Sequence, residues 1–256
     1  MINSIIYGPV ASWRLGRSLG IDLLSTDGKT CSFDCIYCQL GKTIYPLAER
    51  REFVSLDRLR SELAALAKIE ADFVTFSGVG EPTLASNLGQ AIEIAKSVLH
   101  LPVAVLTNSS LIPRGDVRLD LAGADVVVAK VDAPEEKIYR RVNRPYGGYS
   151  IDEIVQGIKL FRENYRGKLA IQMMFIEENK HYARQMAEIA MGLSPDEVQL
   201  NTPLRPCAVK PLRPYALAAI KEEFEGLNVV QVYEAPPYEV TPLNSIETIR
   251  RRPEAQ

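Results

Sequence analysis

The chain has 256 residues, 46% hydrophobic and 24% charged, enough to bury a substantial core in one large α/β domain or two small ones. Its formal net charge of -2 provides no global basic field, which argues against extensive nonspecific binding of nucleic acid. Four cysteines do not form a disulfide framework, and neither a signal peptide nor a run of about 18 apolar residues is present. We therefore expect a protein of the reducing cytoplasm with no membrane partner.

Short apolar runs alternate with amphipathic runs along the chain, which predicts strands alternating with helices. Residues 125–131 form a β-branched run typical of a buried parallel strand, and Ser150 to Glu153 is a capping box that begins a helix. The predicted strands are 18–24, 72–76, 102–106, 125–131, 168–175 and 197–200, with a last edge strand at 229–233. The predicted helices are 55–69, 87–99, 114–122, 134–142, 150–165, 180–191 and 215–224, with a short one at 245–251.

Strand–helix alternation six times over predicts an α/β fold with a parallel sheet and right-handed crossovers. Six units are too few for the eight of a complete barrel. We expect this domain over residues 1–235 and a mostly irregular extension over residues 236–256. Chemistry in such folds takes place at the carboxyl ends of the strands, so polar residues that follow the strands are the first candidates for a site.

Three of the four cysteines, Cys31, Cys35 and Cys38, lie within eight residues in the pattern C-x3-C-x2-C. Thiolates are soft ligands for iron–sulfur clusters, zinc or copper(I). A structural zinc site needs four ligands, whereas the remaining cysteine and the two histidines are distant in sequence. A [4Fe–4S] cluster on three thiolates leaves one iron open for a ligand that is not protein. The loop 25–43 therefore predicts such a cluster, with a zinc loop or three core thiols as alternatives.

This cysteine spacing resembles the signature of the radical S-adenosylmethionine (SAM) enzymes. Those enzymes commonly carry an aromatic residue before the third cysteine, near the SAM adenine, and Tyr37 has that place. The segments 7–10, 15–21 and 38–41 resemble the branch of small iron–sulfur oxidoreductases related to the tRNA wyosine-base (demethylwyosine) synthases. The resemblance covers roughly residues 5–215. It implies a partial, open (β/α)6 barrel of the TIM type, a [4Fe–4S] cluster on the three cysteines and SAM on the open iron.

The resemblance also implies contacts with SAM. The predicted strand 72–76 continues into Ser-Gly-Val-Gly-Glu-Pro, similar to the Gly-Gly-Glu-Pro-type motif that meets the SAM amino group in the family. The glycines let a ligand approach the backbone closely. A plain βα turn is the alternative for this motif, and a salt bridge at the barrel rim is the alternative for Lys130 and Asp132. The expected cofactor-binding residues are Tyr37, Ser77, Gly78, Gly80, Glu81, Asn108, Lys130 and Asp132.

Later strand ends carry the candidates for substrate contact, which are Gln172, Asn201 and Arg205. Interior filler is the alternative for Gln172 and Asn201. Arg205 belongs to a set of basic residues that form either a phosphate-binding rim or a solvated face. Cys207 follows the sixth strand and is a candidate catalytic residue, as a hydrogen donor to a product radical or a ligand of an auxiliary metal. An unreactive packed thiol is its alternative.

The resemblance implies reductive cleavage of SAM to a 5′-deoxyadenosyl radical, which takes hydrogen from an unidentified small metabolite or peptide. The expected partner is a one-electron reductant such as ferredoxin or flavodoxin. A first alternative is tRNA modification of the wyosine-synthase type, which residues 130–145 resemble. Those synthases carry further upstream cysteines, and no cysteine precedes Cys31, so tRNA is not favoured. A second alternative is the activation of a glycyl-radical protein.

Overall fold

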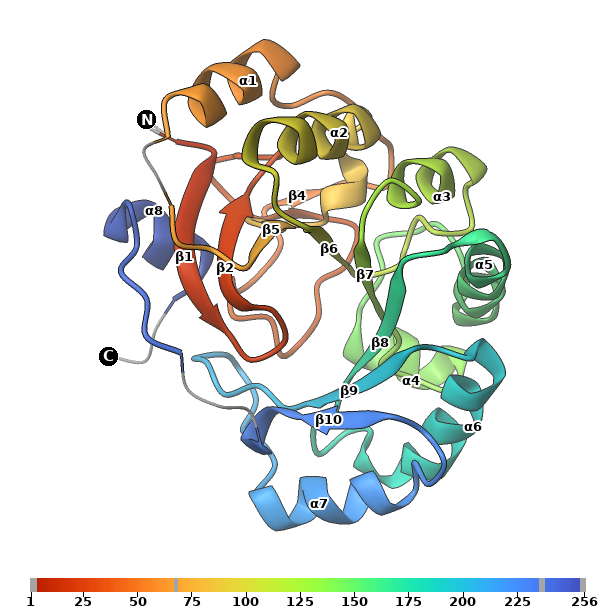
Figure 1. Ribbon diagram of the computed structural model, residues 1–256. Helices are drawn as coiled ribbons and strands as arrows, with labels where there is room; N and C mark the ends of the chain where they lie inside the picture. The colour runs from red at the N-terminus through yellow and green to blue at the C-terminus, as the bar shows by residue number, and fades with distance from the viewer. Residues whose placement is uncertain (1–3, 67–68, 235–237, 254–256) are drawn as a thin grey trace.

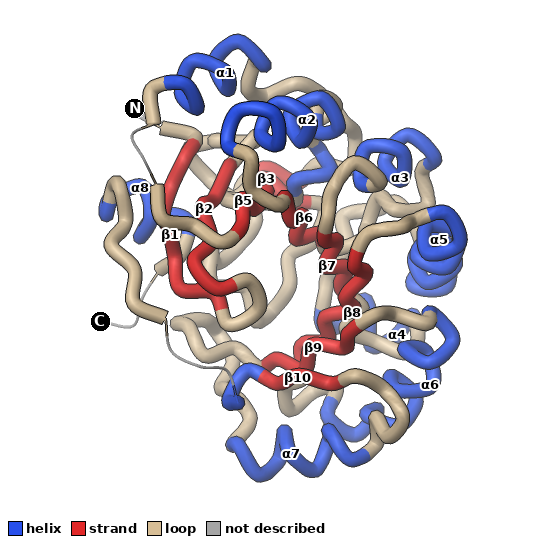
Figure 2. Tube along the Cα trace, viewed as in Figure 1, coloured by secondary structure: helices blue, strands red, loops and turns tan. Residues whose placement is uncertain are grey.

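A computed structural model of the chain describes residues 4–66, 69–234 and 238–253. An eight-stranded sheet curls around an interior, and the helices cover its outer side (Figures 1 and 2). The strands lie in the order β1-β2-β5-β6-β7-β8-β9-β10, so the sheet has two edges, β1 and β10, and is an open barrel. This confirms the partial barrel of the α/β class. The strands are β1 (Ile6–Ser12), β2 (Gly16–Ile21), β5 (Phe73–Phe76), β6 (Val103–Thr107), β7 (Val126–Lys130), β8 (Lys168–Met174), β9 (Glu197–Asn201) and β10 (Val229–Gln231).

The helices follow the predicted order and differ mainly at their ends. The capping box at Ser150 is formed, and Ser55 caps its helix by accepting from the Arg58 backbone N–H at 3.3 Å. The first predicted helix, 55–69, ends at Ala64, and its residues 67–68 lie outside the described residues. The helices are α1 (Leu56–Ala64), α2 (Leu88–Leu99), α3 (Gly115–Leu121), α4 (Glu136–Val142), α5 (Ile151–Asn164), α6 (Ala183–Leu193), α7 (Pro214–Glu222) and α8 (Ser245–Arg251). In the described part of the chain, none is long and apolar enough to cross a membrane.

The first strand, β1, is absent from the sequence prediction, because Gly8 and Pro9 interrupt its apolar run. It pairs antiparallel with β2, and the register shifts between Tyr7 and Val10. All other neighbouring pairs in this sheet are parallel. The Tyr7 ring covers Gly20, where an added Cβ would lie 2.1 Å from the ring. Position 20 therefore has to be glycine for the Tyr7 ring to pack against β2.

The interior of the barrel is lined by small side chains near its carboxyl end. Strand residues alternate between the two faces, so the helices cover one set and the interior receives the other. Ser18 and Thr75 share a hydrogen bond of 2.6 Å, and both line the cavity. These short side chains leave room for a cavity of about 560 Å³.

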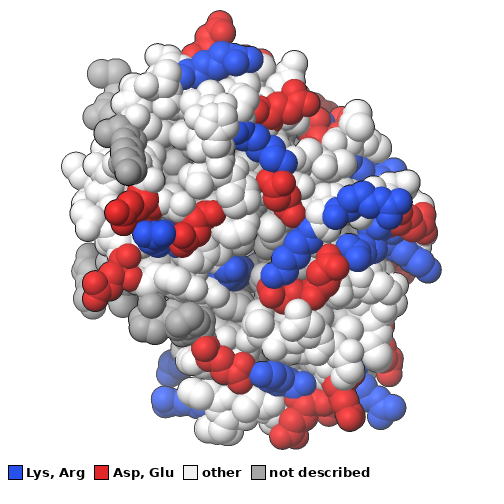
Figure 3. Space-filling model, viewed as in Figure 1, with Lys and Arg blue, Asp and Glu red and all other residues white. Residues whose placement is uncertain are grey.

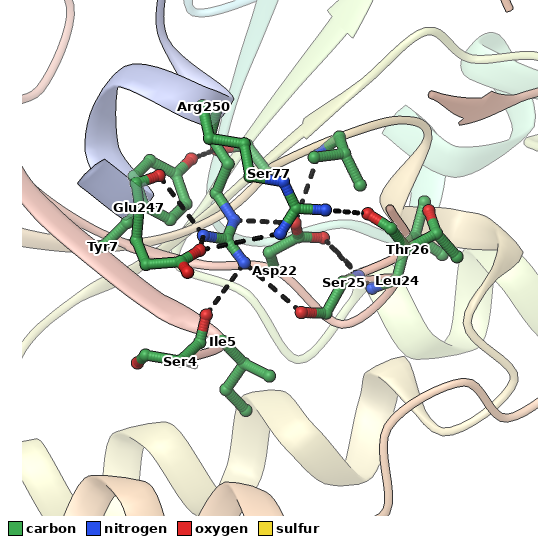
Figure 4. Close-up of polar contacts among 12 residues, drawn as sticks. Ser4, Ile5, Tyr7, Asp22, Leu24, Ser25, Thr26, Ser77, Glu247 and Arg250 are labelled. Atoms are coloured by element: carbon green, nitrogen blue, oxygen red, sulfur yellow. Dashed lines mark hydrogen bonds and ion pairs between the residues drawn. The ribbon is translucent and has the colours of Figure 1, made fainter. Parts of the chain in front are cut away.

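The C-terminal segment docks on the edge strand β1 through α8. The guanidinium of Arg251 donates to Asp22, Glu247, Ser25 and the Ser4 carbonyl. Figure 4 labels these four acceptor residues. Arg251 Nε donates to Asp22 at 2.8 Å, and both side chains are almost fully buried. The segment 238–244 is irregular and α8 is the predicted short helix, whereas the predicted boundary at 235/236 lies outside the described residues.

Replacement of Arg251 by methionine leaves the Asp22 carboxylate buried without its cation and removes the nearer of two cations from Glu247, which keeps Arg250 at 3.6 Å. We expect Arg251→Met to lower the free energy of unfolding by about 3–5 kcal/mol. Urea unfolding of the cluster-free protein, followed by circular dichroism, measures this loss. Arg184→Met is the matched control, since its i,i+4 pair with Glu188 is exposed and should cost less than about 1 kcal/mol. Equal losses of stability in the two variants would contradict the role of the buried Arg251 in holding the C-terminal segment.

Candidate cluster and cofactor site

The cysteine loop follows β2 and is held by backbone hydrogen bonds against the end of α4. The Asp34 N–H donates to the Asn143 carbonyl at 3.0 Å, and the Ile36 N–H donates to the Val142 carbonyl at 3.0 Å. The Phe33 ring meets the Tyr139 ring edge-on, with the ring centres 5.4 Å apart. These contacts between protein groups hold the loop on the fold.

All three cysteines of the loop are free thiols arranged around one lysine. Cys31 is buried, and Cys35 and Cys38 are half-buried. The side chain of Lys29 is 4% exposed. Burial opposes the charge of Lys29, but the charges of Cys38, Cys31 and Cys35 outweigh it, so the pKa of Lys29 is raised. Lys29 is therefore a buried cation near the three sulfurs, and it also lies 3.8 Å from the Asp34 carboxylate.

The donor set consists of three cysteine thiols, the ligand type of an iron–sulfur cluster. Burial raises the pKa of the Cys31 thiol to about 12, so a thiolate at this position needs a strong positive partner such as iron. In the described residues, no three His, Cys, Asp or Glu side chains converge as ligands of one metal ion. The thiolates of a cubane bind separate irons, whereas those of zinc share one ion.

Beside Cys35 lies a buried network centred on the Tyr37 hydroxyl. This hydroxyl donates to the Asp132 carboxylate and accepts from Lys130 Nζ at 2.9 Å and from Asn143 Nδ2 at 3.1 Å. Lys130 Nζ also lies 4.4 Å from the centre of the Tyr37 ring and 3.5 Å from Asp132. Burial, and then the Asp132 charge, raise the pKa of Tyr37 well above its usual range, so the phenol keeps its proton.

Both carboxylate oxygens of Asp132 accept hydrogen bonds from other groups of the protein. Besides Tyr37, it accepts from Asn143 Nδ2 at 2.9 Å and from the Met174 N–H at 2.8 Å. The rim salt bridge between Lys130 and Asp132, an alternative at the sequence level, is present. Lys130 alone of this pair lines the cavity, so Asp132 orients Lys130 and Tyr37 from behind.

Glu81 follows β5, and its carboxylate is also occupied by internal donors. It accepts from the Thr83 N–H at 3.0 Å, the Thr83 hydroxyl at 2.7 Å, the Thr107 hydroxyl at 2.7 Å and the Asn108 N–H at 2.6 Å. Burial raises its pKa, and these hydrogen bonds oppose that shift. Glu81 thus ties the end of β5 to the end of β6.

Two glycines bring the end of β5 against the cysteine loop. A Cβ on Gly80 would lie 1.6 Å from the Thr30 carbonyl oxygen, and one on Gly78 would lie 2.2 Å from the Asp22 carboxyl carbon. Asn108, at the end of β6, donates from Nδ2 to Cys31 Sγ at 3.5 Å. The Gly-Val-Gly-Glu segment therefore adjoins the cysteine loop, as the motif predicts.

The cavity collects most of the predicted cofactor and substrate residues. Its lining includes Tyr37, Cys38, Ser77, Gly78, Lys130, Gln172, Asn201 and Arg205. The predicted residues behind the lining are Cys31, Cys35, Gly80, Glu81, Asn108 and Asp132. Cys207 also lies outside the lining, with its thiol 3.1 Å from the Val209 carbonyl oxygen.

Four residues of the site have no role in the sequence prediction. Asn143 holds Tyr37 and Asp132 and lies 3.5 Å from Cys35 Sγ. Lys29 faces the cysteines, and Tyr7 shares a 2.6 Å hydrogen bond with Ser77 in the cavity wall. Arg14 lines the same cavity. Asn143 and Tyr7 lie in the segments 130–145 and 7–10 that carry the family resemblance, and Lys29 lies in the predicted cluster loop 25–43, whereas Arg14 had no signal.

Comparison with known proteins decides the family. The Radical SAM superfamily profile matches residues 26–190, more than half of the chain. The chain belongs to the radical SAM superfamily. Enzymes of this superfamily use SAM and a [4Fe–4S] cluster, so the resemblance in the cysteine loop is confirmed and these are the cofactors of this radical SAM enzyme.

Individual relatives support the radical SAM assignment. A UPF0026 protein of Methanocaldococcus jannaschii is 41% identical over 90% of this chain and 74% of its own length. The structure resembles a radical SAM methyltransferase from Sphaerobacter thermophilus, with a TM-score of 0.63 and 14% identity over 84% of this chain. It also resembles archaeal TYW1, with a TM-score of 0.56 and 14% identity over 83% of this chain and 72% of that one. At 14% identity, these two structural similarities show a shared fold only. The chain spans 65% of the length of the methyltransferase.

Replacement of Glu81 by glutamine leaves one of its four donors facing an amide NH2 group. We expect Glu81→Gln to lower the free energy of unfolding by about 1–3 kcal/mol, even without SAM, because a buried donor loses its acceptor. Urea unfolding of the cluster-free protein measures the loss. Glu188→Gln, at an exposed position of α6, is the control and should leave stability nearly unchanged. A wild-type midpoint for Glu81→Gln would contradict this tie between β5 and β6.

Proposed function

We propose that this radical SAM enzyme cleaves SAM reductively and removes a hydrogen atom from a small metabolite or peptide bound in the 560 Å³ cavity. The observation that carries the proposal is the loop of three free cysteines with the buried Lys29 near them, because Cys38 of this loop lines that cavity. When bound, the cluster and SAM supply one-electron reduction and hydrogen abstraction. A reductant such as ferredoxin or flavodoxin supplies the electron, and free thiols fit the reducing cytoplasm.

The chain itself binds, orients and encloses the reactants. We assign the SAM carboxylate to Lys130, because its ammonium lines the cavity beside the cysteine loop. Tyr37 and Asp132 fix that ammonium in place. Ser77 and Gly78 bring backbone to the cavity wall for the SAM amino group, while Glu81 and Asn108 hold the neighbouring strand ends.

Gln172 and Asn201 face the cavity and are assigned to the substrate. Cys207 is a weaker candidate as hydrogen donor, because its thiol is engaged by the Val209 carbonyl and lies outside the cavity lining. A donor role for Cys207 requires its loop to move before the thiol reaches a product radical.

Replacement of Cys35 by alanine removes one of the three thiolates. We expect Cys35→Ala, reconstituted anaerobically, to lose the cluster and the dithionite-dependent release of 5′-deoxyadenosine from SAM. Iron and sulfide analysis and chromatography measure the two losses. Cys207→Ala is the matched control and should keep the iron content of the wild type. Full cleavage by Cys35→Ala would overturn the proposal.

Replacement of Lys130 by methionine removes the cation assigned to the SAM carboxylate. We expect Lys130→Met to raise the Kd for SAM by about tenfold or more, as for the loss of one hydrogen bond between charged groups. Equilibrium dialysis with cluster-loaded protein measures this Kd. The control is Lys221→Met, whose ion pair with Glu234 lies on the surface. An unchanged Kd in Lys130→Met would remove this residue from the SAM site.

A further inference from the structure

The charge of the cavity wall is one-sided. Among the described residues, five basic side chains line the cavity and no acidic one does, although the net charge of the chain is -2. Two of the five have carboxylate partners behind the wall: Lys130 pairs with Asp132 at 3.5 Å, and Arg251 pairs with Asp22 at 2.8 Å. The other three basic residues of the wall are Arg14, Arg205 and Arg252, of which Arg205 and Arg252 have further interactions within the protein.

Arg14 lies in the turn between β1 and β2 and has an unused donor. Its Nε is buried and has no hydrogen-bond partner within the described part of the chain. The carboxylate that favours its charge, Glu197, already accepts from Lys168 at 2.8 Å and from Gln199 at 2.7 Å. The guanidinium carbon lies 4.4 Å from the centre of the Trp13 ring, so an aromatic face supports the cation.

Two further guanidinium groups act on Arg14. Burial, together with the charges of Arg252 and Arg205, lowers the pKa of Arg14 to about 9, so it remains protonated at neutral pH. Arg205 comes from the loop after β9 and donates to the Arg252 carbonyl at 3.4 Å, and Arg252 follows α8. Three chain segments thus bring positive charge to one end of the cavity. A buried donor among like charges is costly unless an anion answers it.

We propose that this end of the cavity binds a phosphate group carried by a small substrate. Guanidinium forks match phosphate oxygens in geometry, and a phosphate oxygen accepts the hydrogen bond that the buried Arg14 Nε leaves unmade. The SAM carboxylate is a single charge and is assigned to Lys130. RNA is not favoured, because acidic and basic side chains are interspersed on the face of the molecule shown in Figure 3. The inference rests on the proposed function and names its substrate class.

The chain carries its own reporter for this site, since Trp13 is its single tryptophan and lies beside Arg14 in the cavity wall. We would titrate anaerobically reconstituted, SAM-loaded enzyme with inorganic pyrophosphate and follow tryptophan fluorescence. Sodium acetate of equal ionic strength controls for screening. The variants are Arg14→Gln and Arg14→Lys, with Arg184→Gln as the surface control.

We expect a saturable pyrophosphate response in the wild type and in Arg184→Gln, and a Kd at least tenfold higher in Arg14→Gln. Arg14→Lys keeps the charge without the fork and should be intermediate, which preserves the test if Arg14→Gln does not fold. Pyrophosphate-induced stabilisation against heat is the second readout, because the substitution alters the surroundings of Trp13.

Equal affinity in the wild type and Arg14→Gln, or no saturable response in the wild type, would overturn the phosphate site. A parallel titration uses cluster-loaded enzyme without SAM, in which displacement of pyrophosphate by added SAM would assign the anion to the SAM carboxylate instead. Displacement by tRNA at a lower concentration, counted per phosphate, than by a nucleoside monophosphate would assign the site to RNA. SAM cleavage is measured in the same preparations. Normal cleavage without a pyrophosphate response defeats only this inference, whereas a pyrophosphate response without cleavage defeats the proposed function and leaves the anion site.

Discussion

One carboxylate, that of Asp22, joins three parts of the structure that the site needs. Its Oδ1 accepts from the Leu24 and Ser25 N–H groups and so turns the chain from β2 into the cysteine loop. Its Oδ2 accepts from the Val79 N–H at the end of β5 and from Arg251 of the C-terminal helix. Gly78 has room only for hydrogen beside this carboxylate. The loop, the glycine motif and the tail are therefore positioned by a single buried charge.

Around the cavity too, buried carboxylates are hydrogen-bonded to several groups of the protein at once. Asp132 and Glu81 each have their oxygens filled by protein donors, so they set the geometry of Tyr37, Lys130 and Asn108. Such satisfied networks are rigid, and a cofactor that binds beside them meets preorganised groups. The acidic residues behind the wall keep their charges compensated, and they fix Tyr37 and Lys130, which line the cavity.

Local signals in the sequence predicted the architecture well, because most strands and helices are set by apolar periodicity and caps such as Ser150. The cysteine spacing and the Gly-Val-Gly-Glu segment likewise predicted which stretches would meet. Contacts made across the fold carried no such signal. The sequence around Arg251 and Arg14 does not show that these arginines line the cavity, because that depends on where the tail and the β1–β2 turn lie. Strand β1 was not predicted because Gly8 and Pro9 interrupt its apolar run. Distant pairing therefore limited the prediction more than local structure did.

An open barrel leaves backbone groups at its rim, and β1 shows how this protein covers them. The Gly8 carbonyl accepts from the Leu243 N–H at 2.6 Å, and the Gly8 N–H donates to the Thr248 hydroxyl at 2.9 Å. The C-terminal segment thus acts as a cover for strand β1, in place of a ninth strand. An uncovered edge is a template for pairing with another chain. A chain cut before residue 238 would consequently offer that template, and self-association would compete with folding.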